Sequence, residues 1–272
     1  MRKDERGLAG KTVVLILVAV IIGAAIGVGL VSVFSDNGGR KPRAGHSGGK
    51  GSKPAPVTIP ASDFDQNTWG YLGCSNTHDT IFGYGADPQS KHLFWPFEAF
   101  PTEGMTVRDW TNAADRHWQR FDQAKQRFDG GGDPPVIWVQ LCENLNPSDS
   151  NFSGPSDFGQ VQQMLSLLKQ HSPGSKIFIS PLQAYQPADL CSVMGPNGEA
   201  IPELTDLANQ AVDAGLAFPG PGTDDIPNLG PLTSDLVVSD GCHPSGGPHG
   251  PGNGALVLGQ QLAKFFDNLP QG

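Results

Sequence analysis

The chain has 272 residues, of which 38% are hydrophobic and 17% are charged, and its formal net charge is −9. This length fits one α/β domain of roughly 200 residues with additional segments. From Ala61 onward, 24 acidic and 9 basic residues leave a net charge of −15, with no basic patch bearing interleaved aromatic residues. Such a surface repels nucleic acid, so nucleic acid is excluded as a partner.

The N-terminal region contains an uncharged apolar run from Thr12 to Phe34. As a helix, this run would extend roughly 34 Å at about 1.5 Å per residue, which is enough to cross a bilayer. A cleaved secretory signal is the competing interpretation, but its apolar region is only about 7–15 residues long. No Ala-x-Ala site follows the run. We therefore interpret residues 12–34 as an uncleaved transmembrane signal anchor.

The orientation of this anchor is inferred from the cysteines. Basic residues flank the apolar run on both sides, so the positive-inside rule does not decide the orientation. All four cysteines follow the run, and an even number is consistent with two disulfides outside the cytoplasm. We predict a single-pass protein of the cell membrane, with residues 1–11 in the cytoplasm and the remainder on the extracytoplasmic side.

Residues 35–60 are rich in Gly, Ser, Pro and basic residues and show no apolar periodicity. This composition predicts a disordered linker that precedes a folded domain at 61–272. Its basic residues either contact anionic headgroups or belong to a solvated tether, and the sequence leaves both open.

Apolar patterns in the folded part predict alternating strands and helices. Ser75 is expected at the tip of a first strand over 68–73, and apolar residues three and four apart predict one helix over 108–128. Alternation of this kind predicts a parallel sheet covered by helices on both faces, with a site beyond the carboxyl ends of its strands. Further strands are expected at 92–95, 135–141, 176–180 and 236–238, and further helices around 161–168 and at 202–216 and 253–268.

Two short motifs carry candidate chemistry. Asp240 lies three residues before His243, so its carboxylate can fix the tautomer of the imidazole. Ser75 follows Gly73 closely, and a serine at such a strand end is the usual nucleophile for such a histidine. Either motif alone is weak, but together they indicate acyl transfer.

Four blocks in order resemble the SGNH hydrolase superfamily, also called GDSL-type esterases. The resemblance covers about residues 68–266 and implies a flavodoxin-like three-layer α/β sandwich with a parallel sheet. The blocks are Gly73-Cys74-Ser75, Gly104 to Asp109, Cys142-Glu143-Asn144-Leu145, and Asp240 to Pro244.

The resemblance assigns a role to each matching residue. Ser75 would attack the acyl carbonyl, His243 would accept its proton, and Asp240 would orient His243. The oxyanion hole would comprise the backbone N–H groups of Ser75 and Gly104 and the side-chain amide of Asn144. The implied function is a membrane-anchored extracytoplasmic serine esterase without a cofactor, acting on acetyl or short acyl groups of a surface glycan or lipid.

Cysteines replace family residues in the blocks. Cys74 stands where the family has Asp, Cys142 replaces a glycine, and Leu145 replaces a second Asp. Together with Cys191 and Cys242, these cysteines suggest two disulfides that hold the active-site loops. Of the three possible pairings, Cys74–Cys142 with Cys191–Cys242 is preferred.

Other interpretations of these residues compete with catalysis. Ser75 can be a turn or capping residue, Cys74 a rival nucleophile, and the whole domain a catalytically inactive carbohydrate-binding module on the same fold. His78 and Asp79 are expected to be exposed loop residues. His249 is expected on a surface loop, with a place in the site as the alternative. The cysteines and histidines do not have metal-ligand spacing, so no metal is expected.

Overall fold

The computed structural model describes residues 68–96, 98, 100–102 and 104–269. The predicted N-terminal segment, transmembrane helix and linker over residues 1–60 lie outside the described residues. Among the helices of the described ranges, none is both long and apolar enough to cross a bilayer.

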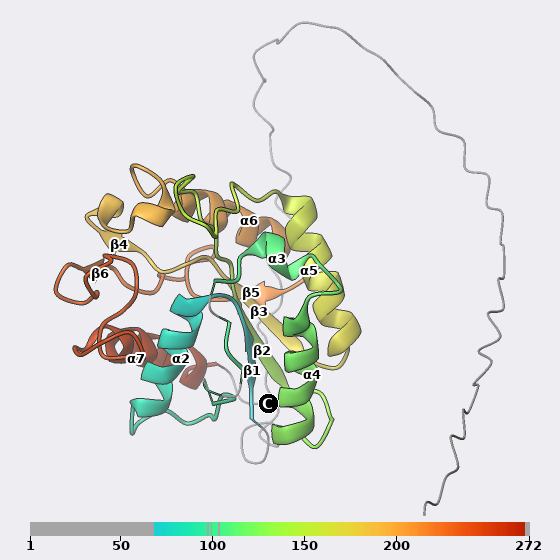
Figure 1. The fold of residues 1–272 in the computed structure, drawn as a ribbon. Helices are drawn as coiled ribbons and strands as arrows, with labels where there is room; N and C mark the ends of the chain where they lie inside the picture. Colours follow the sequence, from blue (N-terminus) through green and yellow to red (C-terminus); the bar gives the residue numbers. More distant parts are fainter. Residues whose placement is uncertain (1–67, 97, 99, 103, 270–272) are drawn as a thin grey trace, which may run out of the picture. The chain divides into compact units, whose positions relative to one another are not determined.

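A parallel sheet forms the centre of the domain (Figure 1). Its strands lie side by side in the order β1 (Gly70–Leu72), β2 (Val136–Gln140), β3 (Lys176–Ser180) and β5 (Phe218–Pro219). On the opposite edge of β1, Trp69 forms a parallel bridge with Phe94. Counted along the chain, the five segments therefore lie in the order 2-1-3-4-5, which is the order of flavodoxin-like folds.

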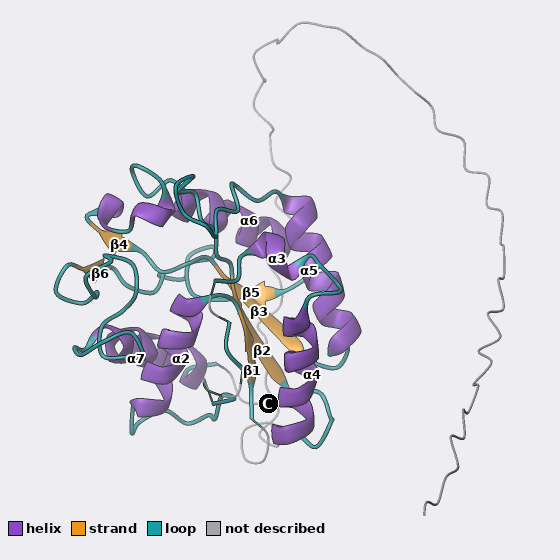
Figure 2. Cartoon of the chain, viewed as in Figure 1, coloured by secondary structure: helices purple, strands orange, loops and turns teal. Residues whose placement is uncertain are grey.

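Helices cover both faces of this sheet, as Figures 1 and 2 show. One face carries α2 (Ser75–Ala86) and α7 (Gly254–Asp267), and the other carries α4 (Arg116–Phe128) and α5 (Phe158–His171). Every residue of β2 is buried, as expected for a strand covered on both sides. The predicted α/β architecture with a parallel sheet is thus confirmed. The remaining elements are α3 (Val107–Trp110), α6 (Ala200–Asp213), the 3-10 turns Ala188–Leu190 and Ser192–Met194, and a small parallel pair of β4 (Tyr185–Gln186) with β6 (Leu232–Thr233).

Helices α2 and α7 pack with their backbones in contact. A Cβ atom at Gly83 would lie 1.8 Å from the carbonyl oxygen of Ala255, and one at Gly259 would lie 2.1 Å from the backbone of Gly83. Only glycine permits this approach, so the two helices meet most closely where Gly83 and Gly259 face each other.

Four predicted elements differ from the structure. The strand expected over 92–95 is reduced to the isolated bridge between Phe94 and Trp69. The helix expected over 108–128 is divided into α3 and α4, because Asp115 caps a new helix by accepting a hydrogen bond from the backbone N–H of His117. The strand expected over 236–238 is reduced to an isolated bridge between Val237 and Pro244. Ser75 does not end a strand but begins α2, which the sequence patterns did not predict.

Aromatic side chains fill the core beneath β1 and α4. Trp95 and Phe100, which precede the second block, are completely buried and belong to this core. Tryptophan and phenylalanine rings meet edge to face, with centroids 5.1 Å apart for both Trp95–Phe121 and Trp110–Trp118.

Candidate active site

Four loops at the carboxyl ends of the strands surround one cavity of about 400 Å³. The cavity is lined by residues of all four blocks, which lie far apart in the sequence. They include Ser75, Gly104, Asn144, Asp240 and His243. The position agrees with the expectation that the site of an open parallel sheet lies beyond the carboxyl ends of its strands.

Ser75 is the first residue of α2, and the turn before it is tightly fixed. Gly73 is required in this turn because a Cβ there would lie 2.0 Å from the hydroxyl of Thr77. The backbone N–H of Cys74 donates to that hydroxyl at 3.0 Å, and Thr102 donates to the Cys74 carbonyl at 2.8 Å. The N-terminus of α2 also places the positive end of the helix dipole at Ser75.

Asp240 and His243 form a pair within one tight loop. The carboxylate Oδ1 of Asp240 accepts hydrogen bonds from the backbone N–H groups of Cys242, at 2.8 Å, and His243, at 3.0 Å. Its Oδ2 lies 2.5 Å from Nδ1 of His243. Gly241 has a φ of 73° in this loop, and a Cβ there would lie 2.4 Å from the Leu190 carbonyl oxygen. The backbone therefore holds the carboxylate against the ring.

The ionisation of Asp240 follows from these contacts. Partial burial raises the pKa of its carboxyl group, but the hydrogen bonds from the His243 side chain and the two backbone N–H groups outweigh this effect. The resulting pKa lies below the ordinary value for aspartate, so the group stays ionised near neutral pH. A carboxylate facing Nδ1 requires a proton on that nitrogen, which leaves Nε2 as an acceptor.

The second ring nitrogen of His243 faces the serine. Its Nε2 lies 2.8 Å from the hydroxyl oxygen of Ser75, across 168 residues of sequence. With the tautomer set by Asp240, the Ser75 hydroxyl donates this hydrogen bond. The structure thus places serine, histidine and aspartate in one continuous chain of hydrogen bonds.

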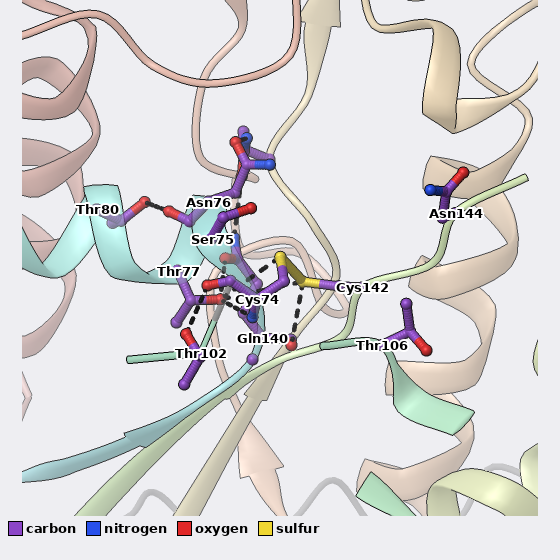
Figure 3. The surroundings of a disulfide bond; sticks show 12 residues. Cys74, Ser75, Asn76, Thr77, Thr80, Thr102, Thr106, Gln140, Cys142 and Asn144 are labelled. Atoms are coloured by element: carbon purple, nitrogen blue, oxygen red, sulfur yellow. Dashed lines mark hydrogen bonds between the residues drawn. A yellow bond between two sulfur atoms is a disulfide. The ribbon is translucent and has the colours of Figure 1, made fainter. Parts of the chain in front are cut away.

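The opposite wall of the cavity carries Asn144. Its side-chain oxygen accepts from the backbone N–H of Asn146 at 3.0 Å, so its amide nitrogen is turned the other way. In Figure 3 this nitrogen lies on the side of Asn144 that faces Ser75. The backbone of Asn144 is fixed by Ser153, whose Oγ accepts from its N–H and whose N–H donates to its carbonyl, both at 3.0 Å.

Both disulfides lie beside these residues. Cys74 is joined to Cys142 and Cys191 to Cys242, with Cα atoms 6.1 and 4.5 Å apart, which is the preferred predicted pairing. The first disulfide connects the residue before Ser75 to the loop of Asn144, as Figure 3 shows. The second connects the residue before His243 to the loop after β4. Because Cys74 is bonded to Cys142, it is not an available nucleophile.

A network of buried polar side chains connects the loops that carry Ser75 and His243. Gln183 donates to Asn76 at 2.6 Å, and the hydroxyl of Tyr185 donates to the carbonyl of Cys242 at 2.8 Å. Burial raises the pKa of Tyr185, so its hydroxyl remains a neutral donor. Gln140 links the network to α2 by accepting from Thr77 at 2.8 Å. The loops of Ser75 and His243 are therefore held in one hydrogen-bonded unit.

Two residues next to the nucleophile are placed differently from the prediction. His78 and Asp79 are buried, with 3% and 0% of their surface exposed, because they lie on the inner side of α2 rather than in a loop. His249 lines the cavity, which was the alternative to a surface loop. Because the sequence patterns predicted no helix after Ser75, no signal in the sequence pointed to this burial.

Glu143 is a buried carboxyl group in the same wall. Only 3% of its surface is exposed, and its Oε1 accepts from the backbone N–H of Ser156 at 2.6 Å. Burial raises its pKa to about 7, and the hydrogen bonds from Ser156 offset this only in part. Within the described ranges, no group of three His, Cys, Asp or Glu residues is placed to hold a metal ion.

Comparison with known proteins gives no family. No family model and no curated protein matches the chain. Solved structures that it resembles include a gut microbial diltiazem-metabolizing enzyme, with a TM-score of 0.43 and 15% identity over 74% of this chain. The chain spans only 46% of the length of that enzyme.

Esterases are also among these neighbours. A carbohydrate esterase has a TM-score of 0.39 and 10% identity, covering 74% of this chain and 68% of that one. An acetyl xylan esterase from the rumen bacterium Butyrivibrio proteoclasticus has a TM-score of 0.30 and 15% identity, covering 76% and 63%. Because all these TM-scores lie below 0.5, we base the function on the geometry of the site.

Proposed function

We propose that this protein is a serine esterase that hydrolyses acyl esters through an acyl-enzyme intermediate, as the SGNH resemblance implies. One observation carries the proposal. The Ser75 hydroxyl lies 2.8 Å from Nε2 of His243, whose Nδ1 lies 2.5 Å from the carboxylate of Asp240. A serine activated by an oriented histidine is the arrangement that nucleophilic acyl transfer requires.

The mechanism follows from these contacts. Ser75 Oγ attacks the acyl carbon while its proton moves to Nε2 of His243, and Asp240 stabilises the imidazolium that forms. The tetrahedral oxyanion is held by the N–H groups of Ser75 and Gly104 and the amide of Asn144. When the intermediate collapses, the alcohol leaves with the proton from His243. Water then attacks the acyl-enzyme while His243 takes one of its protons. Collapse of this second tetrahedral intermediate breaks the bond to Ser75 Oγ, which receives the proton back from His243, and the carboxylic acid is released.

The lining of the cavity favours an uncharged ester. Its lining combines polar side chains such as Asn146 and Asn151 with apolar ones such as Met105 and Val193. No Lys or Arg is among the described residues that line the cavity. We therefore propose acetyl or short acyl groups on a glycan or lipid as substrates. We also propose that residues 12–34 anchor the protein in the membrane, with the catalytic domain on the extracytoplasmic side.

Hydrolysis of p-nitrophenyl acetate by the full-length protein with its disulfides intact tests the proposal. The parent should hydrolyse the ester and react with a fluorophosphonate probe at Ser75. Ser75→Ala should abolish labelling and lower kcat by about 10⁵-fold. An unchanged rate in Ser75→Ala would refute the mechanism. A parent inactive on every short-chain ester would favour the carbohydrate-binding module.

A further inference from the structure

A second histidine lies against the first in the same cavity. The ring of His249 stacks on the ring of His243, with centroids 4.1 Å apart and planes inclined by 28°. The hydrogen bonds of His243 lie at the edge of its ring, between Nδ1 and Asp240 and between Nε2 and Ser75. Contacts at the edge restrict a tilt of the ring plane less than a ring packed on its face does, so the His249 ring adds a restraint that the hydrogen bonds do not supply.

His249 is itself held in place. It follows Pro248 in a tight turn, which is closed by a hydrogen bond of 3.3 Å from Gly250 N–H to the Gly247 carbonyl. Proline in the second position of such a turn restricts its backbone. The side chain of His249 is 30% exposed, so part of its ring faces the cavity.

A buried carboxyl group lies at the Nε2 edge of the His249 ring. Nε2 of His249 lies 3.6 Å from Oδ2 of Asp79, whose side chain is completely buried one helical turn after Ser75. The turn also contacts this carboxyl group, since a Cβ at Gly247 would lie 2.7 Å from Oδ1 of Asp79. The nucleophile's helix therefore positions His249 as well as Ser75.

We propose that His249 is a positioning residue, which fixes the ring plane of His243 so that Nε2 stays aligned with the Ser75 hydroxyl, and that Asp79 holds His249 in that position. The inference rests on the proposed esterase function. A small misalignment of a catalytic group lowers the rate of the chemical step, while the affinity for the substrate is unaffected. The role is therefore separable from substrate binding.

The test compares His249→Ala with His249→Phe in the full-length protein, by kcat and KM on p-nitrophenyl acetate and by the rate of fluorophosphonate labelling. His249→Ala should lower kcat and the labelling rate about tenfold with KM unchanged. His249→Phe keeps a flat ring on His243 and should restore most of the rate. Asp79→Asn, which preserves the buried shape, should lower kcat by a smaller factor.

His171 offers a matched control. It also pairs with an aspartate, Asp122, at 2.9 Å and stacks on Trp118 at 4.8 Å, but it does not line the cavity. His171→Ala should leave kcat unchanged.

Three results would overturn the inference. They are unchanged kcat in His249→Ala, a rise in KM alone, and a His249→Phe variant as slow as His249→Ala. A parent without esterase activity would overturn both proposals. An active parent whose His249 variants have an unchanged kcat would overturn only this one.

Discussion

Two aspartate–histidine pairs each bring their histidine to the cavity, and they are built in different ways. Asp240 and His243 are three residues apart in one loop, and 45% of the Asp240 side chain is exposed. Asp79 and His249 come from α2 and from a loop 170 residues later, and Asp79 is completely buried. The first pair is set by a backbone turn and the second by packing. A site can therefore combine one local and one tertiary device to align the same imidazole.

Breaking the local pair should have a larger effect than any change that acts through packing. Asp240→Asn keeps the shape of the loop. The neutral amide no longer stabilises the imidazolium and no longer fixes the His243 tautomer with its proton on Nδ1, so kcat should fall about 10³-fold. The melting temperature should change little, because asparagine keeps the side-chain oxygen that accepts from the backbone N–H groups of Cys242 and His243. Asp235→Asn, at an exposed aspartate outside the cavity, is the control. A loss below tenfold in Asp240→Asn would show that the tertiary pair alone suffices.

Removal of the Cys191–Cys242 disulfide tests whether the local pair depends on tertiary support. A crosslink over 51 residues stabilises the fold by about 4 kcal/mol through loop entropy. The double variant Cys191→Ser/Cys242→Ser should lose about that free energy of unfolding in urea. Because Cys242 directly precedes His243, kcat should also fall about tenfold. An unchanged urea midpoint would contradict the prediction.

Glu143 is a third carboxyl group near the site, and like Asp79 it is buried. Burial raises its pKa and the negative charge of Glu203 adds to this effect, while the hydrogen bonds from Ser156 lower the pKa. Its folded-state pKa of about 7 lies above the unfolded value of 4.5, so the folded protein binds the proton more tightly. The contribution of this group to stability should be full below about pH 4.5 and should be lost as the pH rises through about 7, which amounts to up to about 3 kcal/mol.

Glu143→Gln removes the titrating carboxyl group and keeps the size and shape of the side chain, so packing is unchanged. Urea unfolding at pH 5 and pH 8 should show a smaller decline for the variant than for the parent. Equal declines in both proteins would show that other groups cause the pH dependence.

Much of the fold follows from the sequence because the central strands contain unbroken apolar runs. Val136 to Gln140 and Lys176 to Ser180 are bounded by turn residues, and their apolar runs predict both strands. The first helix is not predicted because α2 carries buried polar residues such as Thr77 and Asp79, which hide its apolar side. Its N-cap is Cys74, which is not one of the usual capping residues.

The sequence by itself determined the pairing of Asp240 with His243 and the order of the blocks, since these depend on local spacing and on recognisable motifs. It only favoured one of three disulfide pairings, which the tertiary structure then decided. The tertiary structure alone decided that His249 stacks on His243 and that Asp79 lies behind it. The physical reason is that a turn forms between neighbouring residues. A stacked ring and a buried carboxyl group instead depend on how α2 packs against α7 and the loop before it.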